Sequence, residues 1–223
     1  MQTSELIRHL ASGAAPVHRL LPPSLRTATW LGISLPYVCA VVVMKSAAID
    51  FLGKIDARFA LEQAAILATS LTAAIAAFAS VIPGHHRKIY LLPLLPLAVW
   101  LGSLGQGCAH DWLRFGADGL QVRPDWECAP AAIFIGIIPA IAMVVMLRRG
   151  APLAPRVSVT LGALAVAALG NFGLRIFHIG DVSVMVLVWH FGALALISVL
   201  AGRIGRHVLN WRFVMASTVP RSC

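Results

Sequence analysis

CAPAAIFIGIIPAIAMVVML, residues 128–147, runs for 20 residues without a charged side chain. A bilayer core of about 30 Å needs about 20 mostly apolar residues for one helical crossing, so this run predicts a membrane-spanning helix. Similar charge-free runs occupy residues 27–44, 63–86, 89–110, 157–174 and 182–202. They are apolar all round and rich in Ala and Leu, whereas spanning strands alternate polar and apolar residues. The sequence therefore predicts an all-α, polytopic bundle of six transmembrane helices.

The overall composition agrees with a membrane protein. Of the 223 residues, 59% are hydrophobic and only 12% are charged, which is unlike a soluble domain of this size. We expect an N-terminal tail over residues 1–26, the six-helix domain over residues 27–205 and a C-terminal tail over residues 206–223. The sequence contains no phosphate-binding glycine loop, no HExxH motif and no CxxC motif, so no enzymatic activity is expected.

The net charge of +9 is distributed unevenly between the two sides of the predicted membrane domain. One side contains both tails and the loops after the second and fourth helices, with 12 of the 18 basic residues. By the positive-inside rule this side faces the cytoplasm, so both termini are expected there. The charge is thus interpreted as a topology signal, and direct nucleic-acid binding is not expected. Trp30 and Trp112 fall near the predicted inner and outer boundaries, where tryptophan often anchors a helix.

Two cysteines flank the central outer loop of this topology. Cys108 lies near the outer end of the third charge-free run and Cys128 begins the fourth. In an oxidising compartment they could form a structural disulfide, or they could sense oxidants. The two thiols could also, with His110 and His178, supply soft ligands for Cu(I), Zn or a toxic cation. Residue spacing leaves these alternatives open, and no cofactor is expected beyond transient metal ligation.

The N-terminal tail contains apolar residues at helical spacing. Such a face would either dock in the groove of a partner protein or lie on the membrane surface. Its candidate contact residues are Leu6, Ile7, Leu10, Val17, Leu20 and Leu21.

His190 is the ionisable residue expected deepest in the bilayer. A proton or substrate path past His190 would make the protein a small-molecule or ion transporter of the inner membrane, which is the alternative function. A neutral imidazole that forms a hydrogen bond across the bundle is the simpler interpretation.

Six stretches together resemble the NrsF-type (negative regulator of sigma F) integral-membrane anti-sigma factors of proteobacteria. The stretches are PVHRLLPPSLR (16–26), LTAAIAAFASVIPG (71–84), LLPLLPLAVWLGSLGQGC (91–108), DWECAP (125–130), LRRGAPLAP (147–155) and MVLVWHFGALAL (185–196). The order and spacing of these stretches extend the resemblance over nearly the whole chain.

The resemblance implies a regulatory function in the bacterial inner membrane. The N-terminal tail would hold an extracytoplasmic-function sigma factor at the membrane, away from RNA polymerase. Metal or oxidative stress would release it, and the matching sensor positions are Cys108 and Cys128. The tail is shorter than a folded soluble anti-sigma domain, so the loops after the second and fourth helices are expected to assist.

Overall fold

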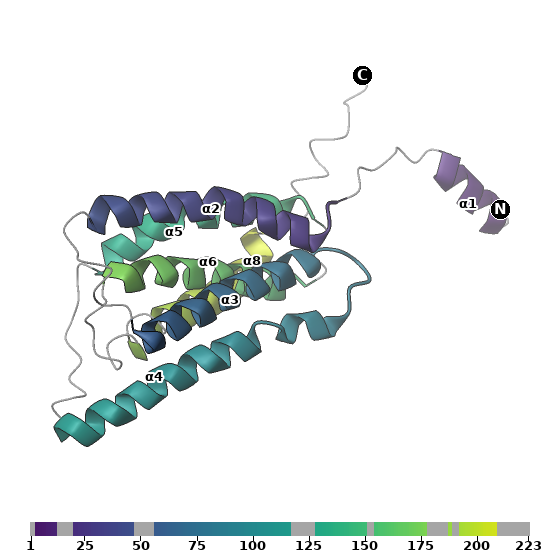
Figure 1. Cartoon of the computed structure of the whole chain (residues 1–223). Helices are drawn as coiled ribbons and strands as arrows, with labels where there is room; N and C mark the ends of the chain where they lie inside the picture. The colour runs from purple at the N-terminus through teal and green to yellow at the C-terminus, as the bar shows by residue number, and fades with distance from the viewer. Residues whose placement is uncertain are drawn as a thin grey trace.

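The described part of the chain is entirely helical. The computed structural model describes residues 3–12, 20–46, 56–116, 128–150, 154–177, 187–188 and 192–208 (Figure 1). No β-strand occurs in these ranges, which confirms the predicted all-α class. The helices are α1 (Thr3–Ser12), α2 (Pro23–Ser46), α3 (Ala57–Ala79), the 3-10 helix η2 (Arg87–Leu91), α4 (Leu94–Phe115), α5 (Cys128–Arg148), α6 (Pro155–Phe177) and α8 (Gly192–Val208).

Five of the described helical segments are long and apolar enough to cross a membrane. They are Pro23–Met44, Ala57–Ala79, Arg87–Phe115, Pro130–Arg148 and Pro155–Ile176. The sixth predicted run, 182–202, overlaps α8, whose apolar part Gly192–Ile204 is shorter than a crossing. Most of residues 178–191 lies outside the described ranges. The sixth crossing and the cytoplasmic position of the termini therefore stay predictions, as do the tail boundaries.

The second predicted run is displaced from the helix that the structure contains. α3 begins at Ala57 rather than at residue 63, and the Asp56 carboxylate caps it by accepting a hydrogen bond from the Phe59 backbone N–H at 2.6 Å. Counting charge-free residues excluded the first two turns because they contain Arg58 and Glu62. The helix ends at Ala79 rather than at residue 86, shortly before Pro83 and Gly84, and Gly84 has a φ of 87°.

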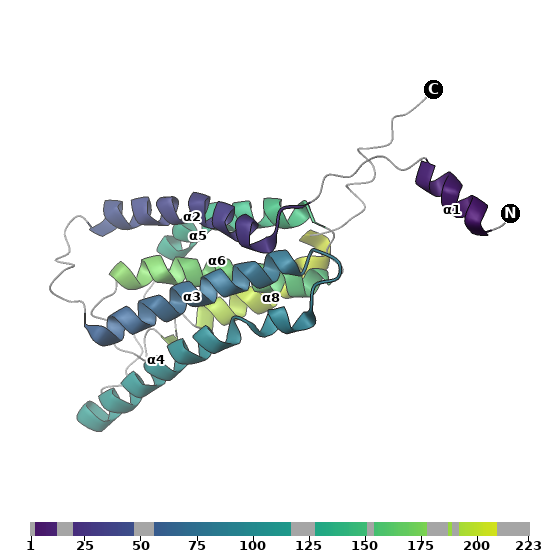
Figure 2. The same cartoon turned by 45° about the vertical axis from the view of Figure 1, so that its right-hand side comes forward.

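Helices α3 and α6 form the centre of the bundle. α3 packs against α2, α4 and α6, and α6 also packs against α2, α5 and α8. We call the end where α2 begins the proximal end and the end where α2 finishes the distal end. Figures 1 and 2 both show α5 and α4 on opposite sides of this centre, with the distal part of α4 leaning away from the other helices. The two central helices therefore connect every other helix of the bundle.

Side-chain hydrogen bonds to backbone carbonyls join α2 to α5. Trp30 is completely buried and its indole N–H donates to the Pro139 carbonyl at 3.0 Å. Tyr37 donates its hydroxyl proton to the Phe134 carbonyl at 2.6 Å. The expected role of Trp30 as a boundary anchor is therefore wrong, because its ring packs inside the bundle. Trp112, by contrast, is 51% exposed near the distal end of α4.

The outer surface of the bundle is strongly apolar. Large aliphatic side chains are exposed along the helices that surround the centre, for example Leu95 of α4, Ile133 of α5 and Leu196 of α8, at 76%, 70% and 60%. Contiguous apolar surface of this kind is unfavourable in water and normal against lipid. The surface therefore supports the prediction of a multi-pass membrane protein.

We predict that Gly150→Ala destabilises the bundle by about 1–3 kcal/mol, the usual cost of overpacking. A Cβ at Gly150 would lie 2.5 Å from Val81 Cγ2 and 2.6 Å from Val81 Cβ. Gly32→Ala is the control, because a Cβ there meets nothing within 4 Å on the exposed side of α2. The free energy of unfolding in detergent micelles is measured for both variants. Equal stability of the two would contradict the close approach of Gly150 to Val81.

Candidate functional site

The N-terminal segment presents an apolar face that no described residue of the bundle covers. Leu6 and Ile7 on α1 are 44% and 62% exposed, and Leu20 and Leu21 before α2 are also exposed. Figures 1 and 2 show α1 standing away from the bundle. The side chain of Leu10 and the whole of Val17 lie outside the described part. The described members of the predicted contact set are therefore available to a partner.

Arg26 attaches the start of α2 to the proximal end of the bundle. The side chain is only 4% exposed, and its guanidinium donates a hydrogen bond to the Met146 carbonyl of α5. The same guanidinium lies 4.6 Å from the ring centroid of Phe78 on α3, within cation–π range. The sequence analysis counted Arg26 only as a topology charge. Its burial instead ties the base of the tail to both α3 and α5.

Of the two predicted sensing cysteines, the structure describes the side chain of Cys108 alone. Cys108 lies in the distal half of α4 as a partly buried free thiol. Cys128 is the first residue of α5, and its side chain lies outside the described part. Because α4 packs on α3 while α5 packs on α2 and α6, the two cysteines come from opposite sides of the bundle (Figure 2). Their pairing therefore stays a prediction.

The predicted metal ligands are not brought together among the described residues. His110 is exposed, and its Nδ1 lies 3.9 Å from Asp111 Oδ1. No group of three or more His, Cys, Asp or Glu side chains that could hold a metal ion occurs in the described ranges. His178 and the intramembrane candidate His190 both fall outside them. Metal ligation at the outer cysteines consequently stays a prediction.

A buried carboxylate that the sequence analysis did not single out lies near the distal end of α3. Glu62 is only 1% exposed. Arg175 at the end of α6 reaches Glu62 Oε2 with Nη2 at 3.3 Å and with Nε at 3.4 Å. Arg58, one turn before Glu62, reaches Oε1 with its Nε at 3.0 Å. We call Arg58, Glu62 and Arg175 the distal ion cluster.

Helix α4 joins the distal ion cluster through Ser103. The Ser103 hydroxyl is 3.4 Å from Glu62 Oε1, and Arg58 Nη2 donates to the Ser103 carbonyl at 3.2 Å. Arg175 also lies 5.5 Å from the ring centroid of Phe59. An ion pair without water around it is favourable only when further hydrogen bonds satisfy the charged groups, and these contacts do so. The cluster thus fixes the distal ends of α3 and α6 and the middle of α4 relative to one another.

Two features of the sequence could have predicted this cluster. Arg58 and Glu62 are four residues apart, which is the spacing of a helical ion pair. Arg175 directly follows a long charge-free run, so it had to find a partner or reach the membrane surface.

The candidate sensing thiol lies on the same helix as Ser103, which contacts the distal ion cluster. Cys108 follows Ser103 by five residues on α4. A negatively charged or metal-bound form of Cys108 would therefore change the electrostatic environment of Arg58 directly.

We predict that Glu62→Gln lowers the free energy of unfolding by about 3–5 kcal/mol, because Arg175 would remain buried without its counter-charge. Arg58→Gln is the control, since Arg58 is 38% exposed and its loss is expected to cost only about 0–1 kcal/mol. Denaturant titration in detergent compares the two variants. A similarly small loss of unfolding free energy in both variants would show that the Glu62–Arg175 pair does not hold the helices together.

Comparison with known protein families matches residues 10–211 to the family described as NrsF, negative regulator of sigma F. Comparisons with curated proteins and with solved structures found no match. The matched range includes the end of α1, all the helices of the bundle and the predicted cysteine positions. The match confirms the resemblance seen in the sequence, and the chain belongs to the NrsF family of negative regulators of a sigma factor.

Proposed function

We propose that this protein is an inner-membrane anti-sigma factor that binds an extracytoplasmic-function sigma factor through its cytoplasmic N-terminal segment. The sigma factor is released when metal or oxidative stress changes the state of Cys108 and Cys128. The observation that carries the proposal is the exposed apolar face of α1, which is attached through residues 13–25 to the buried anchor Arg26. Family membership supports a sigma factor as the partner.

The charge of the proximal end supports a cytoplasmic position for it. The α3–α4 connection, the end of α5, the start of α6 and α8 contribute exposed basic residues on this side: Arg87, Lys88, Arg148, Arg149, Arg156 and Arg203. An excess of Arg and Lys in short loops is the usual mark of the cytoplasmic face. α2 begins at the same end, so the tail would emerge into the cytoplasm, where sigma factors act.

The tail would bind its partner as an amphipathic helix in a groove. Leu6 and Ile7 occupy neighbouring positions on one face of α1, and Leu10 follows one turn later. An apolar helical face of this kind inserts anchors at i, i+3 and i+4 into a hydrophobic groove of a partner. A tail helix of ten residues is too small to bury an RNA-polymerase-binding surface alone. The proximal loops would complete the masking surface.

Helix α3 offers a route for the signal between the two ends of the bundle. Its distal end holds Glu62 of the distal ion cluster, and its proximal end contains Phe78, on which Arg26 stacks. The helix is 23 residues long, or about 35 Å at 1.5 Å per residue. A change at Cys108 would act on Arg58 and hence on α3, which would alter the packing at the base of the tail. A preference of about 1–3 kcal/mol between two packings would change sigma-factor affinity about 5- to 150-fold.

The variant Leu6→Glu/Ile7→Glu is predicted to weaken sigma-factor binding at least about tenfold. Each apolar side chain contributes about 1.5–3 kcal/mol when it is buried, and 1.4 kcal/mol corresponds to a tenfold change in Kd. Ser4→Glu/Ser12→Glu introduces the same charges on exposed polar positions of α1 and serves as the control. Sigma-factor binding by both variants is compared by pull-down with the full-length protein in detergent. Equal capture by the two variants would exclude α1 as the binding face.

The double variant Cys108→Ser/Cys128→Ser is predicted to keep the sigma factor repressed and to abolish induction by the stress. Serine cannot ligate soft metals or form a disulfide. The variant Cys39→Ser removes an exposed thiol on α2 and is expected to respond normally. A sigma-factor-dependent reporter measures basal and induced expression in both strains. Normal induction in the double variant would refute the sensing role.

A further inference from the structure

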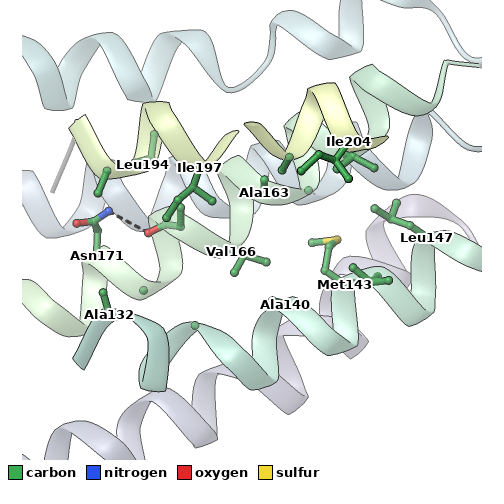
Figure 3. A pocket seen from close by; sticks show the side chains of 18 of the residues that line it. Ala132, Ala140, Met143, Leu147, Ala163, Val166, Asn171, Leu194, Ile197 and Ile204 are labelled. Atoms are coloured by element: carbon green, nitrogen blue, oxygen red, sulfur yellow. Dashed lines mark hydrogen bonds between the residues drawn. The ribbon is translucent and has the colours of Figure 1, made fainter. Parts of the chain in front are cut away.

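A long apolar groove lies between α5 and α8, with α6 as its floor. Its volume is about 540 Å³, and every lining residue except Asn171 is apolar. Figure 3 shows Met143 and Leu147 of α5 facing Ile204 of α8 across the groove, with Val166 of α6 between the two walls. The Asn171 side chain donates a hydrogen bond to the Ala167 carbonyl of its own helix at 3.0 Å. The groove therefore fits a hydrocarbon ligand.

Small residues on the floor and walls create this groove. Near the proximal end, Gly162 of α6 allows Met143 and Leu147 to approach, since a Cβ at Gly162 would lie 3.1 Å from each. Further along α5, Gly136 lines the groove and a Cβ there would meet nothing within 4 Å. The walls therefore touch the floor at the proximal end and leave open space in the middle of the bundle.

The surroundings of the groove determine what can fill it. Its walls are helices with lipid-exposed outer faces, so in a bilayer the groove opens into hydrocarbon rather than water. An apolar space that stays empty forfeits the dispersion contacts of all its lining atoms. Hydrocarbon is therefore the natural filling, supplied by a lipid chain or by another apolar helix.

Three basic residues lie close in sequence to lining residues at the proximal end of the groove. Arg148 follows the lining residue Leu147, Arg203 precedes the lining residue Ile204, and Arg156 lies one turn before Val159. All three arginines are exposed, and α5, α6 and α8 contain no Asp or Glu. Basic pockets between membrane helices on the cytoplasmic side are typical of anionic lipid headgroup sites.

We propose that this groove binds an anionic phospholipid, with an acyl chain between α5 and α8 and the phosphate against Arg148, Arg156 and Arg203. The proposal requires only that the bundle spans a bilayer with its proximal end near the headgroups. A second copy of the chain fits less well. Copies in one membrane share an orientation, so docking there would bring Arg156 and Arg203 of both copies into one leaflet, and α5, α6 and α8 contain no Asp or Glu that could pair with them.

The test uses the full-length protein in mixed micelles that contain either phosphatidylglycerol or phosphatidylcholine of matched chain length. Native mass spectrometry counts the lipids retained by each protein molecule. We expect phosphatidylglycerol to be retained at least about tenfold more than phosphatidylcholine, because only the former has a net negative headgroup. Equal retention of both lipids would overturn the headgroup part of the proposal.

Two pairs of variants locate the site. Gly136→Leu fills the groove and is expected to lose phosphatidylglycerol, whereas Gly102→Leu adds the same side chain to an open, exposed position of α4 and is expected to keep it. Arg156→Gln/Arg203→Gln is expected to reduce the retention of phosphatidylglycerol about tenfold. Its control, Arg87→Gln/Lys88→Gln, removes two exposed charges on η2 and is expected to change this retention little.

The outcomes separate the possible occupants. The arginine substitutions are at exposed positions, so they test the headgroup contact even if Gly136→Leu does not fold. Retention of phosphatidylglycerol by both Gly136→Leu and the arginine variant would overturn the proposal. A lipid-free dimer that Gly136→Leu converts to a monomer would assign the groove to a second copy instead. The binding of the sigma factor is read in a separate pull-down, so the two proposals can fail independently.

Discussion

The buried ion pair between Glu62 and Arg175 is the constraint around which the bundle is organised. A charge inside an apolar helix bundle is tolerated only with a partner and further hydrogen bonds, so the distal ends of α3 and α6 have to remain side by side. Ser103 extends this requirement to α4. Along the rest of α3 and α6, small residues and hydroxyl groups allow close packing, as in the 2.9 Å hydrogen bond from Ser70 to the Ala165 carbonyl.

The proximal end has a polar anchor of a different kind. There Arg26 contacts a backbone carbonyl of α5 and the face of Phe78, and no carboxylate pairs with it in the described part of the chain. Such an anchor is weaker than an ion pair and can exchange partners at lower cost. The two ends of α3 are therefore held by different kinds of contact: an ion pair at Glu62 and a cation–π contact at Phe78.

The sequence predicted most of the fold because the bilayer imposes a simple rule of length and charge. That rule located α2, α5 and α6 well, since no charge interrupts them between their ends. It failed at the start of α3, where it treated Arg58 and Glu62 as outside the membrane helix although Glu62 is buried in the bundle and paired with Arg58 and Arg175. It also assigned Trp30 to the lipid boundary. The sequence alone does not show whether the indole N–H of a tryptophan meets lipid headgroups or, as here, a carbonyl of a neighbouring helix. The groove could not be predicted, because it depends on three helices that meet only in the folded bundle.

The contact between Gly150 and Val81 has a consequence for how a partner protein meets the bundle. Gly150 follows α5 and Val81 follows α3, so the two connections expected to assist the tail touch each other through buried atoms. Under the proposed function, a sigma factor would therefore meet one continuous surface rather than two separate loops. On such a surface, a substitution that adapts one connection to a new partner also repositions the other. Partner choice within the family would then change by coordinated replacements in both connections rather than by single steps.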